Sequence, residues 1–199
     1  MKYKFIAIER EYASGGRIIG EEVAANLSMP CYGNEILLMA AERAGVSAES
    51  LQEYEESANN SLLYTLFRMG QLGSTKNEMP VRDELLLMES TIITEIAAKE
   101  QPCVFVGRAA HSVLIERDDV LSVFVYSDLA SRKKRAIESY GVFPAEAALT
   151  LRKYDHRRAN YYKSYSGKTW NDKSQYHMML NSSILSIEEC AASIMSAVL

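Results

Sequence analysis

A glycine-rich stretch, Glu9–Glu22 (EREYASGGRIIGEE), follows a short apolar run and precedes a helical pattern. A strand, a glycine-rich turn and a helix in succession place backbone N–H groups where they can bind phosphate. The complete nucleotide-binding pattern is G-x-x-x-x-G-K-[ST], in which the lysine reaches the outer phosphates and the hydroxyl binds magnesium. With Gly16 as the second glycine, the other three positions hold Glu11, Arg17 and Ile18. By pattern alone, a simple tight turn is favoured over a nucleotide site.

The residues of this stretch nevertheless have phosphate-binding chemistry. Arg17 carries a permanent charge with bidentate geometry for phosphate, and Arg10 adds a second cation nearby. Ser14 supplies a hydroxyl group, and Gly15 and Gly16 allow a backbone to wrap around an anion. These five residues are the candidates for binding the phosphates of a donor.

A second candidate is Arg108, in the stretch VFVGRAAHSVL. Gly107 and Arg108 follow an apolar run and precede another helical pattern. Ligands of open α/β sheets bind at the carboxyl ends of the strands, so we expect Arg108 to meet an anion there. The alternative is an ordinary exposed arginine.

A third candidate is the basic, aromatic segment Leu151–Trp170 (LRKYDHRRANYYKSYSGKTW). Lys153, His156 and Arg157 share one face of the predicted helix, and Arg158 follows directly. One interpretation is a hinged lid that closes arginines over a transferring phosphoryl group. Another is a stacking platform for single-stranded nucleic acid, and a third is a solvent-facing helix. Because large apolar residues are few in this segment, we expect its helix to be partly detached from the core.

The elements that must position these residues follow from hydrophobic periodicity. Short apolar runs separated by helical patterns indicate a parallel sheet in an α/β fold. The predicted strands are Phe5–Ile8, Val104–Val106, Leu121–Tyr126 and Met178–Leu180. Helices are predicted over Asp83–Lys99 and Ser186–Val198, the second of which begins with a capping box at Ser186 and Glu189. An acidic, Asn-rich pattern predicts an inserted helical arm at about residues 47–80.

Charge and composition limit the class of protein. The chain has 199 residues and a net charge of -4, but the segment from Ser131 to Lys173 contains 11 basic and 4 acidic residues. A basic module on an acidic body favours a phosphate-bearing partner over nucleic acid, whose binders usually present a dominant basic field. No apolar run is long enough for a signal peptide or a membrane span, so we expect a cytoplasmic protein. The spacing of the cysteines and histidines suggests no disulfide framework, hydrolytic triad or zinc site.

Three stretches occur in order along nearly the whole chain: IAIEREYASGGRIIGEEVAANL followed by PCYGNEIL, then PCVFVGRAAHSVL, then LTLRKYDHRRANYYKSYSGKTW with MMLNSSILSIEECAASI. Together they resemble the cytidylate kinase-like family of P-loop nucleoside monophosphate kinases. The resemblance implies a three-layer α/β/α P-loop kinase-like fold, with a parallel β-sheet, over a single domain of residues 1–199. It also implies a helical lid at about residues 144–173, and ATP and Mg²⁺ as cofactors.

The resemblance also implies roles for individual residues. Arg108 matches the arginine that contacts the acceptor nucleotide, and Asn34 and Glu35, after the second strand, would line the acceptor side. The donor phosphates would be held by Ser14, Gly15, Gly16 and Arg17, while Arg132, Arg157 and Arg158 close from above. The implied catalytic arginines are therefore Arg17, Arg108, Arg157 and Arg158. The family's acidic residue before the loop glycine corresponds to Glu9. Val106 and Ala109 replace family aspartates, so magnesium would be held chiefly by the nucleotide and water, with no protein ligand assigned.

Three functions remain open from the sequence. The first is an ATP-dependent nucleoside monophosphate kinase of cytidylate kinase-like type with an unidentified acceptor. The second is a nucleotide-binding sensor of the same fold without phosphoryl transfer, which Glu11, Ile18 and Val106 favour. The third is a single-stranded RNA binder that uses the basic aromatic helix. The expected partners are a nucleotide or another small phosphate-bearing substrate, with no membrane association, and a homodimer contact is possible near Leu62–Met69.

Overall fold

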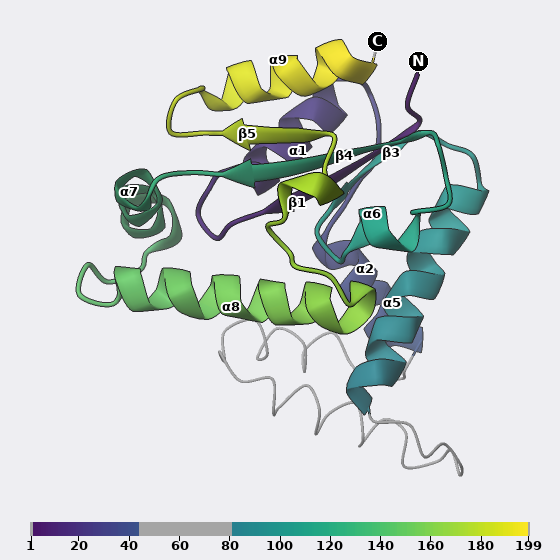
Figure 1. Cartoon of the computed structure of the whole chain (residues 1–199), viewed down its shortest axis with the longest axis horizontal. Helices are drawn as coiled ribbons and strands as arrows, with labels where there is room; N and C mark the ends of the chain where they lie inside the picture. Colours follow the sequence, from purple (N-terminus) through teal and green to yellow (C-terminus); the bar gives the residue numbers. More distant parts are fainter. Residues whose placement is uncertain (1, 44–80, 199) are drawn as a thin grey trace. The chain divides into compact units, whose positions relative to one another are not determined.

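The computed structural model describes residues 2–43 and 81–198, with the side chains of 81–85 excepted. In this part of the chain, five parallel strands form one sheet in the order β2-β3-β1-β4-β5 (Figure 1). The strands are β1 (Phe5–Arg10), β2 (Cys31–Tyr32), β3 (Cys103–Val106), β4 (Val120–Tyr126) and β5 (Met178–Asn181). The predicted parallel α/β fold and its four predicted strands are confirmed.

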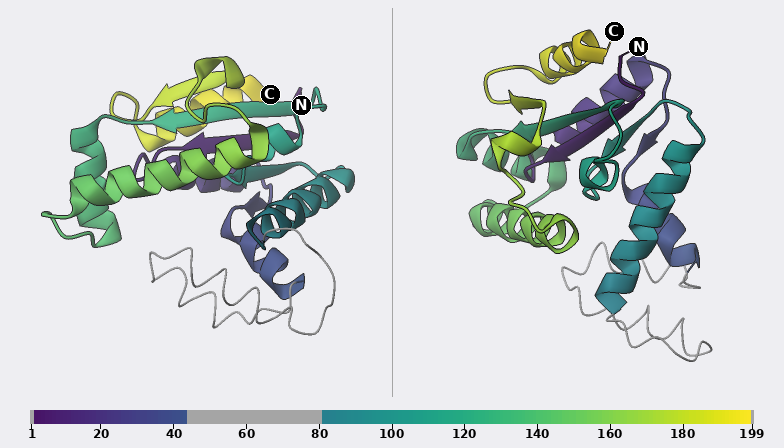
Figure 2. Two further views of the ribbon diagram at one scale, coloured as in Figure 1. Left: turned by 60° about the horizontal axis from the view of Figure 1, so that its bottom comes forward. Right: turned by 45° about the vertical axis from the view of Figure 1, so that its right-hand side comes forward.

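Helices cover both faces of this sheet, which gives the three layers expected from the sequence. Alternate residues of each strand point to opposite faces. Ile6, Ile8 and Val123 pack in one core with α1 (Gly16–Asn26) and α9 (Ile187–Val198). Phe124 faces the other side, where α6 (Ala110–Val113) and α8 (Ala147–Ser166) lie (Figures 1 and 2). A further helix, α7 (Leu129–Tyr140), packs against α8, and a short 3₁₀ turn spans Lys173–Gln175.

The strand order reverses on the two sides of β1, which lies in the middle of the sheet. The chain passes from β1 through β2 and β3 on one side, and then to β4 and β5 on the other. At such a switch point the connections after neighbouring strands diverge and leave room for a ligand. The segments that follow β1 and β3 therefore meet at one edge of the sheet, and they contain the candidates Ser14, Gly15, Gly16, Arg17 and Arg108.

The predicted C-terminal helix is confirmed together with its cap. The N–H of Ser186 donates to Oε2 of Glu189 at 2.8 Å, and the N–H of Glu189 donates to Oγ of Ser186 at 3.1 Å. This reciprocal pair is a capping box, which satisfies two N–H groups at the start of the helix. Among the described helices, none combines the length and apolar character needed to cross a bilayer.

Residues 33–99 form a separate compact unit. Its described part consists of α2 (Asn34–Arg43) and α5 (Val81–Ala98), which pack against each other. The predicted helix over Asp83–Lys99 is confirmed, and it buries Ile92 and Ile96. The predicted arm at residues 47–80, including the possible dimer contact, lies outside the described residues.

Candidate functional site

The loop between β1 and α1 is held by hydrogen bonds to its carbonyl groups. Every carbonyl oxygen from Arg10 to Ser14 accepts at least one bond, and the bond to Glu11 comes from Ser14 within the loop. The other donors are remote side chains: Arg158 to Arg10, Arg132 to Tyr12, Arg135 to Ala13, and Ser182 to Ser14. Because α7, α8 and the segment after β5 supply these donors, the shape of the loop is set by the rest of the fold.

Fixed carbonyl groups also fix the amide groups. In a trans peptide the N–H points away from the C=O of the same peptide plane, so a fixed carbonyl also fixes the direction of the following N–H. The N–H groups of Glu11, Tyr12 and Ser14 are themselves bonded, to the Val125 carbonyl, the Asp155 carboxylate and the Glu11 carbonyl. Ala13 (φ 59°) and Gly15 (φ 84°) are left-handed, and such a residue in the loop is typical of backbone concavities that bind anions. Gly16 is also needed for space, because a Cβ there would lie 2.4 Å from Cβ of Arg10 and 3.1 Å from Cβ of Val125.

Arg132, which was expected to close over the donor phosphates from above, lies instead at the centre of an ion-pair cluster next to the loop. Its side chain is 8% exposed, and Nη1 lies 3.1 Å from Oε2 of Glu11, while Nη2 pairs with Asp155 of α8. Its Nε donates to the carbonyl of Tyr12 at 2.8 Å. Burial raises the pKa of Glu11, and the Ser127 N–H and Arg132 oppose that shift. This arrangement gives Arg132 a role in holding the loop.

Arg10 places a guanidinium group against the turn after β3. A Cβ on Gly107 would overlap Nη1 of Arg10 and lie 2.9 Å from its Cζ, so the guanidinium rests directly on that glycine. Its Nε is buried and has no hydrogen-bond partner in the described part of the chain. Burial, and after it the charges of Arg158, Arg108 and Arg17, lower the pKa of Arg10 to about 9, with Glu9 opposing the shift. Arg10 is therefore a crowded cation that an anionic ligand would stabilise.

Arg108 lies where the sequence predicted, directly after the carboxyl end of β3. Its backbone is left-handed (φ 59°), as are those of Gly107 (φ 82°) and Ala109 (φ 51°) on either side. Residues with a Cβ rarely adopt this conformation, and strained backbones occur disproportionately at functional sites. The Arg108 guanidinium lies 5.9 Å from the ring centroid of Tyr161 in α8.

Other predicted residues lie on more open surfaces. The Arg17 side chain is 64% exposed, and its Nε pairs with Oε1 of Glu21 one turn further along α1 at 2.8 Å. Arg157 lies with its guanidinium 5.6 Å from the ring centroid of Tyr154. Asn34 and Glu35 begin α2 in the separate unit, where the Glu35 carboxylate accepts the N–H of Gly33 at 2.7 Å. Their predicted roles stay predictions.

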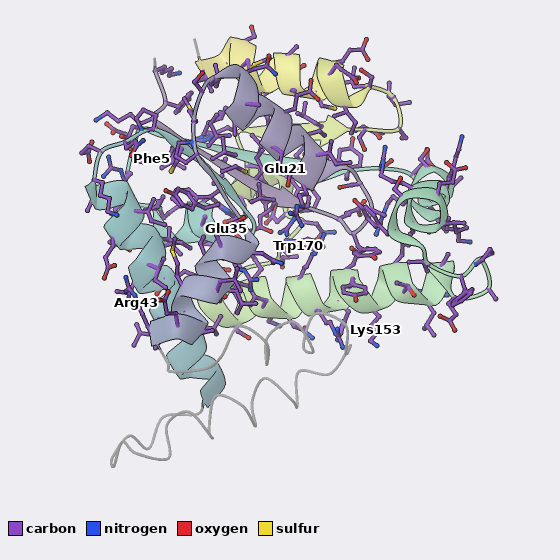
Figure 3. The ribbon with its side chains drawn as sticks, turned by 180° about the vertical axis from the view of Figure 1, so that it is seen from behind. Phe5, Glu21, Glu35, Arg43, Lys153 and Trp170 are labelled. Carbon is purple, nitrogen blue, oxygen red and sulfur yellow. The ribbon has the colours of Figure 1, made fainter. Side chains whose placement is uncertain are left out.

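The basic helix α8 is bound to the body of the protein, contrary to the expectation that it is partly detached. Tyr162 is 1% exposed, and its hydroxyl forms a hydrogen bond of 2.8 Å with Nε2 of buried His111. Tyr154 stacks on Tyr12 of the loop with centroids 4.4 Å apart, and Trp170 is buried. These rings are therefore used in packing, while Lys153 lies on the side of α8 away from the sheet (Figure 3).

Two acidic residues of the site were not among the candidates. Asp155 accepts the N–H of Tyr12 at 2.7 Å and pairs with Arg132. Glu9 is 4% exposed, and its two carboxylate oxygens accept the N–H of Ala109 and the indole N–H of Trp170, each at 3.0 Å. The sequence held one sign of a special role for each residue. Asp155 is the only acid in the basic helix α8, and Glu9 is an acid inside the apolar strand β1.

The donor set suits a phosphate better than a metal ion bound by the protein alone. Within the described ranges, no group of three or more His, Cys, Asp or Glu residues could hold a metal. The Ser14 hydroxyl donates to the carbonyl of Glu11 at 2.9 Å. The cations around the loop, in contrast, match the charge of a phosphate group. The residues therefore fit the phosphates of a nucleotide, and a magnesium ion that came with it would be held mainly by the nucleotide and water.

Comparisons with known proteins agree with this fold. The model of the cytidylate kinase-like family matches residues 5–184. An uncharacterised protein from Eubacterium ventriosum has a similar structure, with a TM-score of 0.73, 20% identity, and 98% of this chain and 97% of that chain covered. A shikimate kinase from Acinetobacter baumannii in complex with shikimate has a TM-score of 0.55 and 12% identity, with 98% of this chain and 93% of that chain covered. A gluconokinase from Sinorhizobium meliloti has a TM-score of 0.53 and 13% identity, with 97% of this chain and 90% of that chain covered. No curated protein matches the chain.

Proposed function

Because the chain belongs to the cytidylate kinase-like family, we propose that it is an ATP-dependent kinase of the nucleoside monophosphate kinase type, which transfers a phosphoryl group to an unidentified small acceptor. The observation that carries this proposal is the grouping of Arg10, Arg108 and Arg158 at the carboxyl ends of β1 and β3. Arg158 donates to the carbonyl of Arg10 at 2.9 Å, and Arg10 rests on the glycine that precedes Arg108. The negative charge of Glu9 partly offsets the repulsion between Arg10 and the neighbouring arginines.

Such a site suits phosphoryl transfer because the protein need do little covalent chemistry. Catalysis consists of aligning two substrates and neutralising the charge on the transferring group. In this proposal Ser14, Gly15 and Gly16 hold the donor phosphates, with Arg10 and Arg17 as the neighbouring cations. Arg108 holds the acceptor, and Arg157 and Arg158 contribute from α8. Arg132 keeps the loop in shape, and magnesium supplies further charge neutralisation when it is bound with the nucleotide.

The test is an assay of ADP release with ATP, magnesium and a panel of acceptors. The panel contains nucleoside monophosphates and, because neighbours in fold are a shikimate kinase and a gluconokinase, small hydroxylated acids as well. Turnover with one acceptor, lowered in Arg108→Ala and Arg17→Ala but unchanged in Lys153→Ala, is the expected result. Lys153 is the matched control because it is an exposed cation of α8. If ATP binds but no acceptor gives turnover, the kinase proposal is rejected.

A nucleotide sensor without phosphoryl transfer is the second candidate. It is favoured by Glu11, which occupies the position of the first loop glycine and whose carboxylate is bound to Arg132 and to the N–H of Ser127. In this alternative, ATP binding changes the bonds between the loop and α8. Saturable ATP binding in the absence of any turnover, abolished by Arg10→Gln, would support it. The RNA-binding alternative lacks comparable support, because Tyr162 and Trp170 are buried.

A further inference from the structure

We propose that Glu9 is a positioning residue for Arg108, because its buried carboxylate holds the left-handed turn Gly107–Ala109 from which Arg108 extends. The inference rests on the proposed function, in which Arg108 contacts an anionic substrate. Glu9 touches no reacting atom in this account. It acts through the backbone of Ala109.

The turn needs an external restraint. Gly107, Arg108 and Ala109 have φ values of 82°, 59° and 51°, so three consecutive residues are left-handed. Glycine adopts this region freely, whereas each residue with a Cβ is strained there. Arg108 and Ala109 therefore favour a different backbone unless the surrounding structure holds them, and a relaxed turn would direct the Arg108 side chain elsewhere.

The Glu9 carboxylate supplies that restraint and is itself fixed. Its Oε1 accepts the N–H of Ala109, the last left-handed residue, at 3.0 Å in a buried environment. Its Oε2 accepts the indole N–H of Trp170 at 3.0 Å, and the Trp170 ring lies edge-on to Phe124. Trp170, labelled in Figure 3, follows α8 in the chain. One carboxylate thus links β1, the turn after β3 and the segment after α8.

Electrostatics and positioning predict opposite effects when Glu9 loses its charge. The negative charge of Glu9 acts on Arg10, so its removal leaves the arginine group more positive and, through Coulomb attraction alone, strengthens anion binding. If Glu9 instead holds the turn, its removal weakens binding. In Glu9→Gln, the amide NH₂ must face either Ala109 N–H or Trp170 Nε1–H, both of which are donors.

The experiment is a calorimetric titration of the full-length chain with inorganic pyrophosphate. We expect Glu9→Gln to weaken binding about tenfold, as for one lost charge-assisted contact. Arg108→Ala should have a similar effect, and the Glu9→Gln/Arg108→Ala double variant should be no weaker than Arg108→Ala, since the two residues act as one unit. Adding Ala109→Gly to Glu9→Gln should restore binding, because glycine takes the left-handed conformation without the restraint. Glu138→Gln, at an exposed acid of α7, is the control for a change of charge.

Each other outcome has a distinct meaning. The unmodified chain could fail to bind pyrophosphate, or Arg108→Ala could bind it with unchanged affinity. Either result rejects the anion site of the proposed function and this inference with it. Binding that depends on Arg108 but is unchanged or stronger in Glu9→Gln overturns only the positioning role. If Glu9→Gln does not fold, Trp170→Phe provides the same test, because it removes one donor to Glu9 and keeps an aromatic ring. Its loss of affinity should again be reversed by Ala109→Gly, and a loss that Ala109→Gly does not reverse contradicts the proposal.

Discussion

The carboxylate of Asp155 in α8 accepts the backbone N–H of Tyr12, in the loop after β1, at 2.7 Å. One turn further along the helix, Arg158 donates to the carbonyl of Arg10, the residue at which β1 ends and the loop begins. The helix predicted as a lid is thus bonded to the loop that it was expected to close over. A displacement of α8 would therefore change the backbone of the loop as well.

The ion-pair cluster next to the loop should contribute measurably to stability. In Arg132→Met, the Glu11 and Asp155 carboxylates lose their shared cation, and the Tyr12 carbonyl loses a donor. Removing one partner of a buried pair costs several kcal/mol, but these two carboxylates are 24% and 23% exposed. We therefore expect the free energy of unfolding to fall by about 2 kcal/mol in urea denaturation. Lys134→Met, at an exposed position of α7, should change it little, and equal effects of the two substitutions would contradict the cluster's role.

Two left-handed glycines offer a matched test of the contact between Arg10 and the turn after β3. At Gly141 (φ 65°) an added Cβ meets nothing within 4 Å, so Gly141→Ala should lose only about 1 kcal/mol for the backbone conformation. At Gly107 (φ 82°) the Cβ would also overlap the Arg10 guanidinium. Because these atoms end a flexible side chain, the guanidinium must shift, and we expect Gly107→Ala to cost about 2 kcal/mol and to weaken pyrophosphate binding. Similar losses of stability in both variants would show that Arg10 does not rest on Gly107 in solution.

His111 should make stability depend on pH. It is buried, and its Nδ1 has no hydrogen-bond partner among the described residues. Burial lowers the pKa of His111, Lys168 and His177 act in the same direction, and Glu9 opposes them. The unfolded chain then takes up a proton near pH 6.5, while the folded protein takes it up only at lower pH. Stability is therefore fully present above pH 6.5 and falls as the pH drops below it.

The measurement is urea denaturation between pH 5.5 and 7.5. In His111→Phe, which keeps an aromatic ring beside Tyr162, the loss of stability on acidification should be smaller than in the unmodified chain. His156→Gln, at an exposed position of α8, should leave the pH dependence unchanged. An identical slope in His111→Phe would mean that other groups cause the acid sensitivity.

Arg17 should be dispensable for stability. Its ion pair with Glu21 is exposed and lies at i,i+4 on α1, a geometry that contributes about 0.3–0.5 kcal/mol. We expect Arg17→Ala to change the free energy of unfolding by about 0.5 kcal/mol or less. Thermal or urea unfolding checks this directly, and a loss well above that value would contradict the expectation.

The fold could be predicted because its signals are local. The buried strands are short apolar runs, and the capping box at Ser186 and Glu189 lies within four residues of sequence. The placement of Arg108 followed from a general property of parallel sheets, in which ligands meet the strand ends. The partners of Glu9 lie 100 and 161 residues away in sequence, and that of Asp155 on the loop lies 143 residues away. No local pattern reveals such pairs.

The basic helix shows the same difference between local and tertiary information. Its charge and aromatic content were visible in the sequence, but which side of the helix would be buried was not. Arg158 and Tyr162 lie on the inner side, four residues apart, while Lys153 and His156 lie on the exposed side. Because both sides contain cations and polar groups, hydrophobic periodicity gives only a weak signal for their orientation.

The carbonyl groups of Arg10–Ser14 have a consequence for protein engineering. Four of their donors, Arg132, Arg135, Arg158 and Ser182, come from outside the loop. A transplant of these five residues into another scaffold would not carry their conformation with it. In the native scaffold, side chains that make no such contact can be replaced without loss of these bonds, whereas Glu11 and Ser14 bond to Arg132 and to the Glu11 carbonyl and must be kept. The conformation of the loop therefore depends on α7, α8 and the segment after β5, and a redesign of its specificity must keep these donors.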